Sequence, residues 1–403
     1  MVDGDSGQVL SYPMRGEGPL DPPAEWADLR RRCPAATVRL PSGDEATLVT
    51  RHADVKQVLS DPRFTRPLPG GGGARVADSE SGGVFNTEMA ATIPQFGDEH
   101  QRWRQRIGRW FTAKRMATLR PRIERKADEL IDAMVADGAP ADLKSALAFP
   151  LPVWVICDML GVPDSDRGRF SHWSDTLLSM TRYTQAEIDA AQAEFVEYML
   201  AHVRAMRADP GDDLLSELAA DTETTFSDGE LVATGQSLLV AGHETTANMI
   251  GKMVAMLLAD RTRWERLCAE PALVRTTVEE ALRFDANSGF GMLRHLDDDL
   301  EIADTVLPEG TTVVCSMASA NRDEDFFTDA DDMTLDRSPN PHLAFGAGGH
   351  SCLGQALART ELQTTLEVLL RRLPTLEPAV PVDELRRLDG LVVGGLEEVP
   401  VRW

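Results

Sequence analysis

Cysteine is scarce in this sequence, and so are the cysteine arrangements that define whole classes of protein. Only five cysteines occur in 403 residues, and no two of them share a CxxC spacing. An odd, widely separated set of this kind does not form a disulfide framework and argues against a structural zinc site. The pattern fits a protein that works in a reducing cytoplasm.

Long apolar runs and positive charge are also lacking. The uncharged stretches Ser145 to Cys157 and Leu231 to His243 fall short of the about 18 apolar residues that a membrane span needs. The acidic start, Met1 to Asp5, is no secretory signal. The 41 basic residues are outnumbered by 65 acidic ones, which gives a net charge of −24. So acidic a chain is a poor partner for nucleic acid or an anionic membrane, and we expect neither.

The periodicity of the sequence predicts one large, mainly helical domain with a small β portion. Helical spacing dominates residues 99–284, and breakers such as Gly161-Val-Pro163 separate the helices. Shorter signals predict a hairpin at 37–49, a helix at 54–59, a strand at 311–315, and a C-terminal pair in which 391–393 joins 399–401 through Gly394-Gly395. No repeat or linker divides the chain, so we expect a single domain over 1–403 whose first 20 residues are extended.

One predicted helix combines an apolar surface with a polar centre. Ser227-Asp-Gly-Glu230 is a capping box, and the run after it continues to Leu258 with few charges. About thirty residues would span roughly 45 Å, enough to cross a large domain. The apolar surface on nearly all sides predicts a buried, central helix. Its middle nevertheless reads Ala241-Gly-His-Glu-Thr-Thr246, and polar groups that are costly to bury indicate a functional site.

A glycine-rich segment near the C-terminus carries the clearest chemical signal. Phe345-Gly-Ala-Gly-Gly-His-Ser-Cys-Leu-Gly354 can turn tightly and approach a flat, bulky group. Cys352 stands at the start of the helical run Leu353 to Leu370, where a helix N-terminus lowers the pKa of a thiol. A single thiolate in such a loop suits one axial bond to a metal cofactor, whereas phosphate binding would call for a P-loop lysine that is absent. A buried core thiol is the alternative.

The glycine-rich segment matches the haem-binding signature FGxGxHxCxG of the cytochrome P-450 superfamily. From about Leu48 to the C-terminus, the chain resembles the soluble bacterial, actinomycete-like members of that family. The resemblance implies a single large domain of the P-450 fold, with haem b between the long helix and the cysteine loop. It also implies that the Cys352 thiolate ligates the haem iron, and that Phe345 and Gly346 belong to the loop that binds the haem.

The polar centre of the long helix resembles the oxygen-activating motif of the same family. By this resemblance, Ala241 and Gly242 leave room for O₂ and let the helix open locally, so that freed carbonyls hold water. Thr245 would support oxygen activation through a hydrogen bond, and Glu244 would relay protons. His243 stands at a variable position of the motif, and we interpret it as structural.

Two further sets of residues match the family. Glu280-Ala-Leu-Arg283 matches the ExxR motif, whose pair joins an arginine before the haem loop, and Arg337 fits that place. These three residues would support the haem core. The candidates for holding the two haem propionates, for which arginine is a natural bidentate partner, are His100, Arg104, Arg294 and His350. His295 is interpreted as structural.

Residues 102–126 are the exception to the acidic character of the chain. They contain eight arginines, among them Arg106 and Arg109, and two lysines against the single acid Glu124. In the family this region flanks the thiolate side of the haem, where electron donors dock. The chain has no flavin or nicotinamide motif, so we expect electrons from NAD(P)H to arrive through a ferredoxin reductase and an acidic ferredoxin. We expect the chain to be a monomer.

The substrate pocket is the part that the sequence defines least. By analogy with the family, its walls are the loop Thr65 to Gly97, the long helix, residues 288–292 and the turn at 392–393. The candidate contacts are Phe85, Met89, Ile93, Leu239, Ser288, Phe290, Met292 and Val392. Small residues at 288, 289 and 291 indicate a roomy cavity. This favours a bulky, mostly apolar natural product such as a macrolide, polyene or terpenoid.

The expected activity is hydroxylation or epoxidation in secondary metabolism, such as antibiotic biosynthesis. A fatty-acid or xenobiotic hydroxylase is one alternative, and Arg66 and Arg75 are the only cations in the long loop that could anchor a fatty acid. A peroxide-driven peroxygenase is another, although that lineage typically lacks the acid–alcohol pair that Glu244 and Thr245 provide here. A haem-binding sensor or helper protein is the non-enzymatic alternative. A sensor would need an output domain, and helpers tend to lose the cysteine or the ExxR pair.

Overall fold

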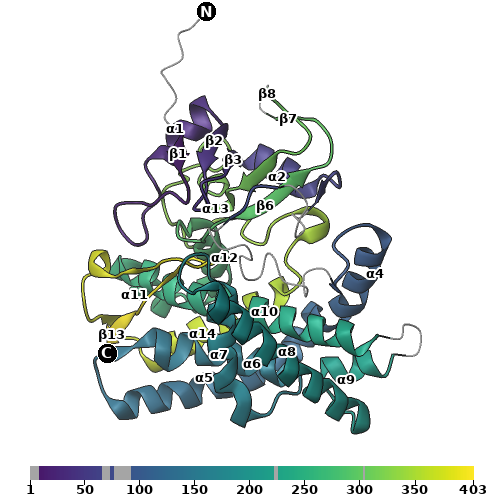
Figure 1. The fold of residues 1–403 in the computed structure, drawn as a ribbon. Helices are drawn as coiled ribbons and strands as arrows, with labels where there is room; N and C mark the ends of the chain where they lie inside the picture. Colours follow the sequence, from purple (N-terminus) through teal and green to yellow (C-terminus); the bar gives the residue numbers. More distant parts are fainter. Residues whose placement is uncertain (1–8, 66–72, 77–91, 222–225, 303–304) are drawn as a thin grey trace, which may run out of the picture.

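The computed structural model of the chain describes residues 9–65, 73–76, 92–221, 226–302 and 305–403. The described helices form one large body, and several strands lie together on one side of it (Figure 1). The helices are α1 (Glu25–Arg32), α2 (His52–Ser60), α4 (Gly97–Gly108), α5 (Ala113–Asp137), α6 (Pro150–Met159), α7 (Arg167–Leu177), α8 (Gln185–Ala208), α9 (Leu214–Ala219), α10 (Asp228–Leu258), α11 (Arg261–Ala269), α12 (Val274–Phe284), α13 (Met317–Ala320) and α14 (Gln355–Arg372). The strands are β1 (Leu10–Ser11), β2 (Ala35–Arg39), β3 (Glu45–Val49), β4 (Phe64–Thr65), β5 (Ala141–Asp142), β6 (Met292–Leu296), β7 (Leu300–Ile302), β8 (Thr305–Leu307), β9 (Thr312–Cys315), β10 (Glu377–Pro378), β11 (Arg387–Leu388), β12 (Gly395–Leu396) and β13 (Pro400–Arg402).

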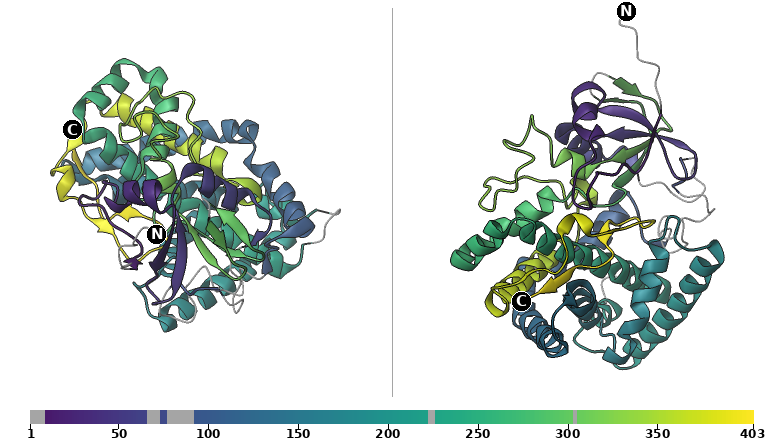
Figure 2. Two further views of the ribbon diagram at one scale, coloured as in Figure 1. Left: turned by 90° about the horizontal axis from the view of Figure 1, so that it is seen from above. Right: turned by 90° about the vertical axis from the view of Figure 1, so that its left-hand side faces the viewer.

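A six-stranded sheet forms the centre of the strand-rich side, in the order β1-β2-β3-β9-β6-β4. The predicted hairpin is confirmed, because β2 and β3 pair antiparallel with Thr37 opposite Thr47. The predicted strand at 311–315 is β9, which lies between β3 and β6. Figure 2 shows this sheet and α1 on one side of the helical body. Within the sheet, β6 places Arg294 opposite Val313 of β9.

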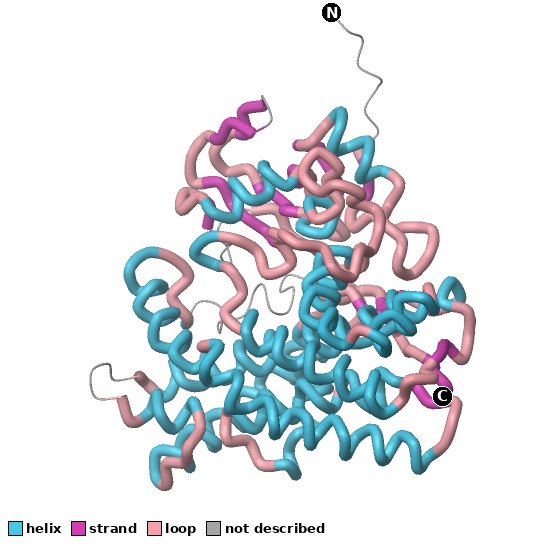
Figure 3. Tube along the Cα trace, turned by 180° about the vertical axis from the view of Figure 1, so that it is seen from behind, coloured by secondary structure: helices cyan, strands magenta, loops and turns pink. Residues whose placement is uncertain are grey.

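The long helix α10 lies in the middle of the helical body (Figure 1), where it packs against α6, α8 and α14. Seen from behind, helices make up most of this body (Figure 3). Its predicted capping box is present: Ser227 accepts a hydrogen bond from the Glu230 N–H, and the Glu230 carboxylate accepts one from the Ser227 N–H over 2.8 Å. Every residue from 246 to 258 is buried. The prediction of a capped, central and buried helix is therefore confirmed.

The predicted C-terminal pairing is wrong. Residues 391–393 make only single bridges, to Ser179 and Gly289, and the later half pairs as β13 with β10 and β5. The reason lies in the glycines between the two halves. A Cβ atom at Gly394 would lie 2.1 Å from the carbonyl oxygen of Asn287, so the backbone of this turn packs directly on the segment that follows α12. The glycines serve that close contact instead of closing a hairpin.

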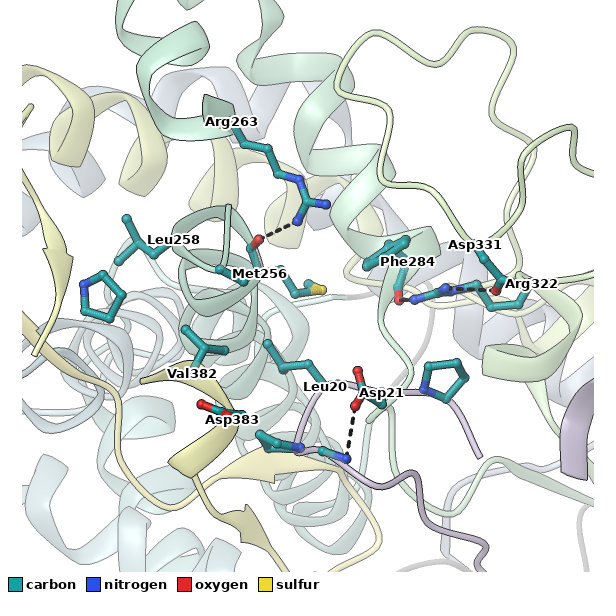
Figure 4. Close-up of a pocket in the computed structure, with 15 residues that line it drawn as sticks. Leu20, Asp21, Met256, Leu258, Arg263, Phe284, Arg322, Asp331, Val382 and Asp383 are labelled. Carbon is teal, nitrogen blue, oxygen red and sulfur yellow. Dashed lines mark hydrogen bonds and ion pairs between the residues drawn. The ribbon is translucent and has the colours of Figure 1, made fainter. Parts of the chain in front are cut away.

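A surface cavity of about 620 Å³ opens at the C-terminal end of α10, beside residues 18–22 (Figure 4). Both arginines that line it have partners in the protein. Arg322 pairs with Asp331 over 3.1 Å, and Arg263 donates to the Met256 carbonyl over 2.9 Å. These contacts hold the loops around the helix end together. Among the described helices, none is long and apolar enough to span a membrane.

Candidate active site

The glycine-rich segment forms a loop that presents Cys352 just before α14. The backbone N–H of Cys352 donates to the Phe345 carbonyl over 2.7 Å, which closes the loop. Gly346 and Gly348 have φ values of 68° and 69°, a region that favours glycine. A Cβ atom at Gly348 would also lie 2.6 Å from the backbone of Leu59. The glycines therefore let the loop pack against α2 while the side chain of Cys352 stays accessible.

The thiol of Cys352 does not ionise readily in this loop on its own. Desolvation by the surrounding protein raises its pKa, while the Gly354 N–H and the guanidinium groups of Arg104 and Arg359 lower it, with a net upward shift. The Gly354 N–H at the start of α14 does lower the pKa, as predicted for a helix N-terminus, but desolvation outweighs it and the net shift is upward. A thiolate here needs positive charge closer to the sulfur, which a metal ion bound to it provides.

A largely buried ion cluster supports the segment before this loop and brings together the three residues matched to the ExxR motif. Arg283 and Glu280 have no exposed side-chain area, and Nη2 of the arginine lies 2.8 Å from Oε1 of the glutamate. Arg337 donates to the same carboxylate over 3.0 Å. Arg283 also donates to three backbone carbonyls between Asn321 and Asp332. The cluster thus fixes the path of the chain that leads into the cysteine loop.

A second ion cluster, which the sequence did not indicate, starts one residue earlier on α12. Glu279 accepts a hydrogen bond from Arg359 of α14 over 2.8 Å and lies 3.1 Å from Nε2 of His342. Burial alone would raise the pKa of Glu279, but these two partners lower it to about 2. The Arg359 guanidinium also lies 4.4 Å from the centre of the Phe345 ring. The members of this second cluster are far apart in the sequence, so no local pattern identifies them.

The exposed face of α10 carries the predicted oxygen motif. Among residues 231–258, only Ala241 and Thr245 are exposed, and their spacing of one turn puts them on the same face. Thr245 Oγ1 donates to the Ala241 carbonyl over 2.8 Å. The helix is continuous at this point, so the expected local opening is absent from this fully described helix. Gly242 faces α6, where a Cβ atom would lie 3.1 Å from Ile156.

Glu244 lies on the buried side of the same motif. It is 5% exposed, and Nδ2 of Asn248 donates to its Oε2 over 3.1 Å. Burial raises the pKa of Glu244 to about 7, and the Lys144 ammonium is the strongest influence that lowers it. Lys144 belongs to the π-helical turn before α6 and donates to the Leu396 carbonyl over 2.6 Å. A carboxyl with this pKa can take up and release a proton near neutral pH.

Three of the four residues predicted for the propionates lie beside the cysteine loop. The rings of His100 on α4 and His350 on the loop are stacked with their centres 4.3 Å apart. Arg104, one turn after His100, donates to the Ser351 carbonyl over 2.7 Å. Helix α4 therefore places a histidine and an arginine against the residues that directly precede Cys352.

Arg294 is the fourth candidate, and its surroundings indicate a missing acidic partner. It is 1% exposed, and the one hydrogen bond of its guanidinium to the described residues goes to the adjacent Leu293 carbonyl over 2.8 Å. Desolvation lowers the pKa of this buried guanidinium, although the Cys315 thiol raises it slightly. A buried cation without a carboxylate is unfavourable. Together with the accessible Cys352 thiol, this cation fits haem, which brings an iron and two carboxylates.

The residues predicted to contact substrate differ in exposure. Ser288 is exposed and Met292 and Val392 are partly exposed, Ile93, Leu239 and Phe290 are buried, and Phe85 and Met89 lie outside the described residues. Phe290 packs edge-on against the ring of Tyr12 with the ring centres 5.1 Å apart. The accessible side chains of this wall are therefore those at 288, 292 and 392.

Two further buried polar residues of α10, His243 and Lys252, have partners within the protein. Nδ1 of His243 is 2.7 Å from the Leu239 carbonyl, and burial lowers the pKa of this histidine to about 4, so it is neutral, as its structural interpretation requires. Lys252 is 3% exposed and lies 2.6 Å from Asp285. The sequence did contain a signal for Lys252, because it is the single lysine in an otherwise apolar helical run.

Comparisons with known proteins place the chain in one family. A profile of the cytochrome P450 family matches residues 166–393. The chain is 44% identical to nocardicin C N-oxygenase of Nocardia uniformis subsp. tsuyamanensis over 98% of both proteins. It is 38% identical to mycinamicin IV hydroxylase/epoxidase of Micromonospora griseorubida over 99% of this chain and 100% of that protein. The crystal structure of SgvP, which is involved in the tailoring step of griseoviridin, has a TM-score of 0.92 at 37% identity, covering 98% of this chain and 100% of SgvP.

Replacing Lys144 with methionine should raise the pKa of Glu244 above about 7, because the change removes the cation that most favours the ionised carboxylate. The infrared band of the protonated carboxyl, followed against pH, measures this pKa, and Glu244→Gln identifies the band. Lys126→Met removes a lysine that pairs with Glu129 on α5 and serves as the matched control. A titration midpoint that is unchanged or lower in Lys144→Met would contradict the role of Lys144.

Proposed function

Because this chain belongs to the cytochrome P450 family of haem-thiolate monooxygenases, we propose that it hydroxylates or epoxidises a bulky, mostly apolar natural product. One atom of O₂ enters a C–H bond or an alkene of the substrate, and the other leaves as water after two electrons and two protons are supplied. One observation carries the proposal. The chain combines an accessible cysteine, Cys352, in a glycine-rich loop with a buried helix, and the exposed residues of that helix over 231–258 are Ala241 and Thr245.

The choice of substrate class rests on the wall residues and on the relatives. Ser288 is small and exposed, and the neighbouring Met292 and Val392 offer partly exposed apolar surface. Gly289 and Gly291 do not widen the pocket as expected, because a Cβ atom there would lie 2.2 Å from the Val392 carbonyl oxygen and 2.7 Å from the Cys315 carbonyl oxygen. Two relatives are named for the oxidation of nocardicin C and of mycinamicin IV. Accessible apolar contacts suit a large, mostly apolar molecule better than a small polar one.

We assign Cys352 as the iron ligand, with Arg104, Arg294, His100 and His350 holding the carboxylates of the haem. When bound, haem supplies the redox-active iron at which O₂ is reduced. The cysteine loop keeps the sulfur in place through its bond between Cys352 N–H and the Phe345 carbonyl. The buried Arg294 gains the acidic partner that the described protein residues do not offer it.

Glu244 and Thr245 control the supply of protons in this proposal. With a pKa of about 7, the Glu244 carboxyl can give up a proton and recover one at neutral pH. The Thr245 hydroxyl donates to the Ala241 carbonyl, which leaves its oxygen on the exposed face as a hydrogen-bond acceptor. An acid and an alcohol at consecutive positions of α10 support reduction of O₂ with protons, and this favours a monooxygenase over a peroxide-driven enzyme.

The electron donor in this proposal is an acidic ferredoxin, itself reduced by NAD(P)H through a reductase. The fold neutralises much of the basic stretch in internal ion pairs, namely Arg106 with Asp221, Arg115 with Glu217, Arg120 with Glu367, Arg122 with Asp158 and Lys126 with Glu129. Arg109 and Lys114 are exposed and have no ion pair with the described residues. They flank the end of α4, where a Cβ atom at Gly108 would lie 3.7 Å from Leu353, next to Cys352. We therefore place the docking site at Arg109 and Lys114 and exclude Arg106 from it.

Cys352→Ser should abolish the strongly red-shifted Soret band of the reduced carbonyl complex, because a thiolate ligand is required for that band. Absorption spectra of the reduced, carbon monoxide-treated protein measure it. Cys33→Ser removes another exposed thiol and should keep the band. If Cys352→Ser keeps the red-shifted band, the iron ligand is a different residue.

A bulky apolar natural product should shift the Soret band of the haem-loaded protein and be oxidised. A library of macrolides, polyenes and terpenoids is screened by absorbance, and compounds that bind are incubated with ferredoxin, reductase, NAD(P)H and isotopically labelled O₂. The product should carry one labelled oxygen atom. Preferential turnover of fatty acids would replace this proposal with a fatty-acid hydroxylase, and equal turnover with peroxide alone would indicate a peroxygenase.

Reversing the charges of Arg109 and Lys114 to glutamate should slow reduction by ferredoxin about tenfold or more at low salt and flatten its salt dependence, because steering by these cations is lost. Stopped-flow reduction at several ionic strengths measures both effects. Arg39→Glu/Arg402→Glu changes the net charge equally at two exposed positions in β2 and β13 and should leave reduction nearly unchanged. Equal rates for the docking variant and the parent would place the donor elsewhere.

A further inference from the structure

A buried ion pair joins the C-terminal half of α10 to the segment that follows α12. Nζ of Lys252 donates to Oδ2 of Asp285 over 2.6 Å and to the carbonyl of Asn287 over 2.7 Å. The other oxygen of Asp285 accepts a hydrogen bond from the Asn287 N–H over 3.0 Å. All three residues are less than 9% exposed. The Lys252 side chain thus holds the side chain of Asp285 and the backbone of Asn287, in the segment that leads into Ser288.

The same segment is joined to the C-terminal turn by a side-chain hydrogen bond and by backbone contacts. Nδ2 of Asn287 donates to the Gly395 carbonyl over 2.9 Å, and the Phe290 N–H donates to the Val392 carbonyl over 2.8 Å. A Cβ atom at Gly289, where φ is 100°, would lie 2.2 Å from the Val392 carbonyl oxygen. Residues 287–292 and 392–395 are therefore held together, and the two segments are here called the paired wall. It contains the accessible positions 288, 292 and 392 of the proposed substrate pocket.

The position of Lys252 on α10 relates this wall to the oxygen motif. Lys252 follows Thr245 by seven residues, so the two lie on the same face of the helix, about 10 Å apart along its axis. Every residue of α10 after Thr245 is buried, so an apolar side chain at 252 would be expected on packing grounds alone. Replacing a buried ion pair with well-packed apolar residues is often neutral or stabilising. The pair is therefore better explained by the geometry that it imposes than by a gain in stability.

We propose that Lys252 and Asp285 are positioning residues for substrate selection: their ion pair sets the paired wall relative to the Thr245 face of α10. This setting determines how large a molecule fits beside the iron and which of its carbons faces the site of oxidation. The proposal rests on the proposed function for its effect on products, but its effect on the size of the pocket can be measured without turnover.

The central experiment replaces the pair with apolar residues of similar size, in Lys252→Met/Asp285→Leu, so that neither charge is left buried alone. Imidazole and 4-phenylimidazole bind haem iron and differ in size, and Soret titration of the haem-loaded protein gives both affinities. Their ratio should change by about tenfold or more, the scale on which small changes in pocket shape alter discrimination. The red-shifted carbonyl band should remain. With a substrate that is turned over, the ratio of product isomers should change as well.

The matched control is Arg39→Met/Glu45→Leu, which removes an exposed ion pair of the β2–β3 hairpin, and it should change neither ratio. Asn287→Ala is the second variant, because it retains the ion pair but removes the side-chain bond to Gly395. It should also change the ratio of the two azole affinities, and it provides the test if the double variant does not fold. An unchanged azole ratio in a folded, haem-loaded variant overturns the positioning role. If the variants change the ratio of the azole affinities but the parent protein forms no product from any substrate, the positioning role is supported and the proposed function is contradicted.

Discussion

The geometry of the site depends on the hydrogen bonds that the buried carboxylate of Glu280 accepts. A charge without exposed surface is tolerated only when its oxygens are fully bonded, and this one accepts hydrogen bonds from Arg283, Arg337, Asn340 and the N–H of Thr334. Arg283 lies on α12 itself, and the other donors come from residues 334–340, a segment that passes close to α12. Because the two arginines then use their remaining N–H groups on backbone carbonyls, an irregular stretch of chain acquires a fixed path. That path ends at the loop that carries Cys352.

Helix α10 has to satisfy two requirements that conflict. As the central helix it must be apolar enough to be buried from 246 to 258, and in the proposed function it must also carry groups that exchange protons. The conflict is resolved by position around the helix. Thr245 and Ala241 share the exposed face, while Glu244 and Asn248 bond to each other one turn apart on the buried side. Lys252 is buried as well, and its charge is matched by Asp285 from outside the helix.

The sequence predicted those features whose residues are close together in the chain. The capping box of α10, the β2–β3 hairpin and the glycine loop each depend on spacings of a few residues, so local pattern identifies them. The predicted pairing of 391–393 with 399–401 was wrong because the glycines between them, which resemble a turn, instead allow a close contact with Asn287, over a hundred residues away in the chain. The roles of Lys144, Glu279 and Lys252 were missed for the same reason, since their partners lie on other elements. The rise in the pKa of Cys352 could not be predicted either, because desolvation depends on the whole fold.

Three glutamates, of which Glu244 and Glu361 are buried and Glu279 is partly exposed, show how the number of donors around a carboxyl sets its chemistry. Glu279 accepts hydrogen bonds from Arg359 and lies beside His342, its pKa falls to about 2, and it acts as a permanent anion that holds α12 to α14. Glu361 on α14 is fully buried, neither of its oxygens has a partner among the described residues, and burial raises its pKa well above the ordinary value, so it is neutral. Glu244 lies between these extremes, with one amide donor and a lysine nearby, and its pKa is about 7. Of the three, this is the carboxyl whose charge can change near neutral pH, and it is the one adjacent to Thr245. The same side chain therefore serves as an anchor or as a neutral core group, and in the proposed function as a proton carrier, according to the donors that the fold brings to it.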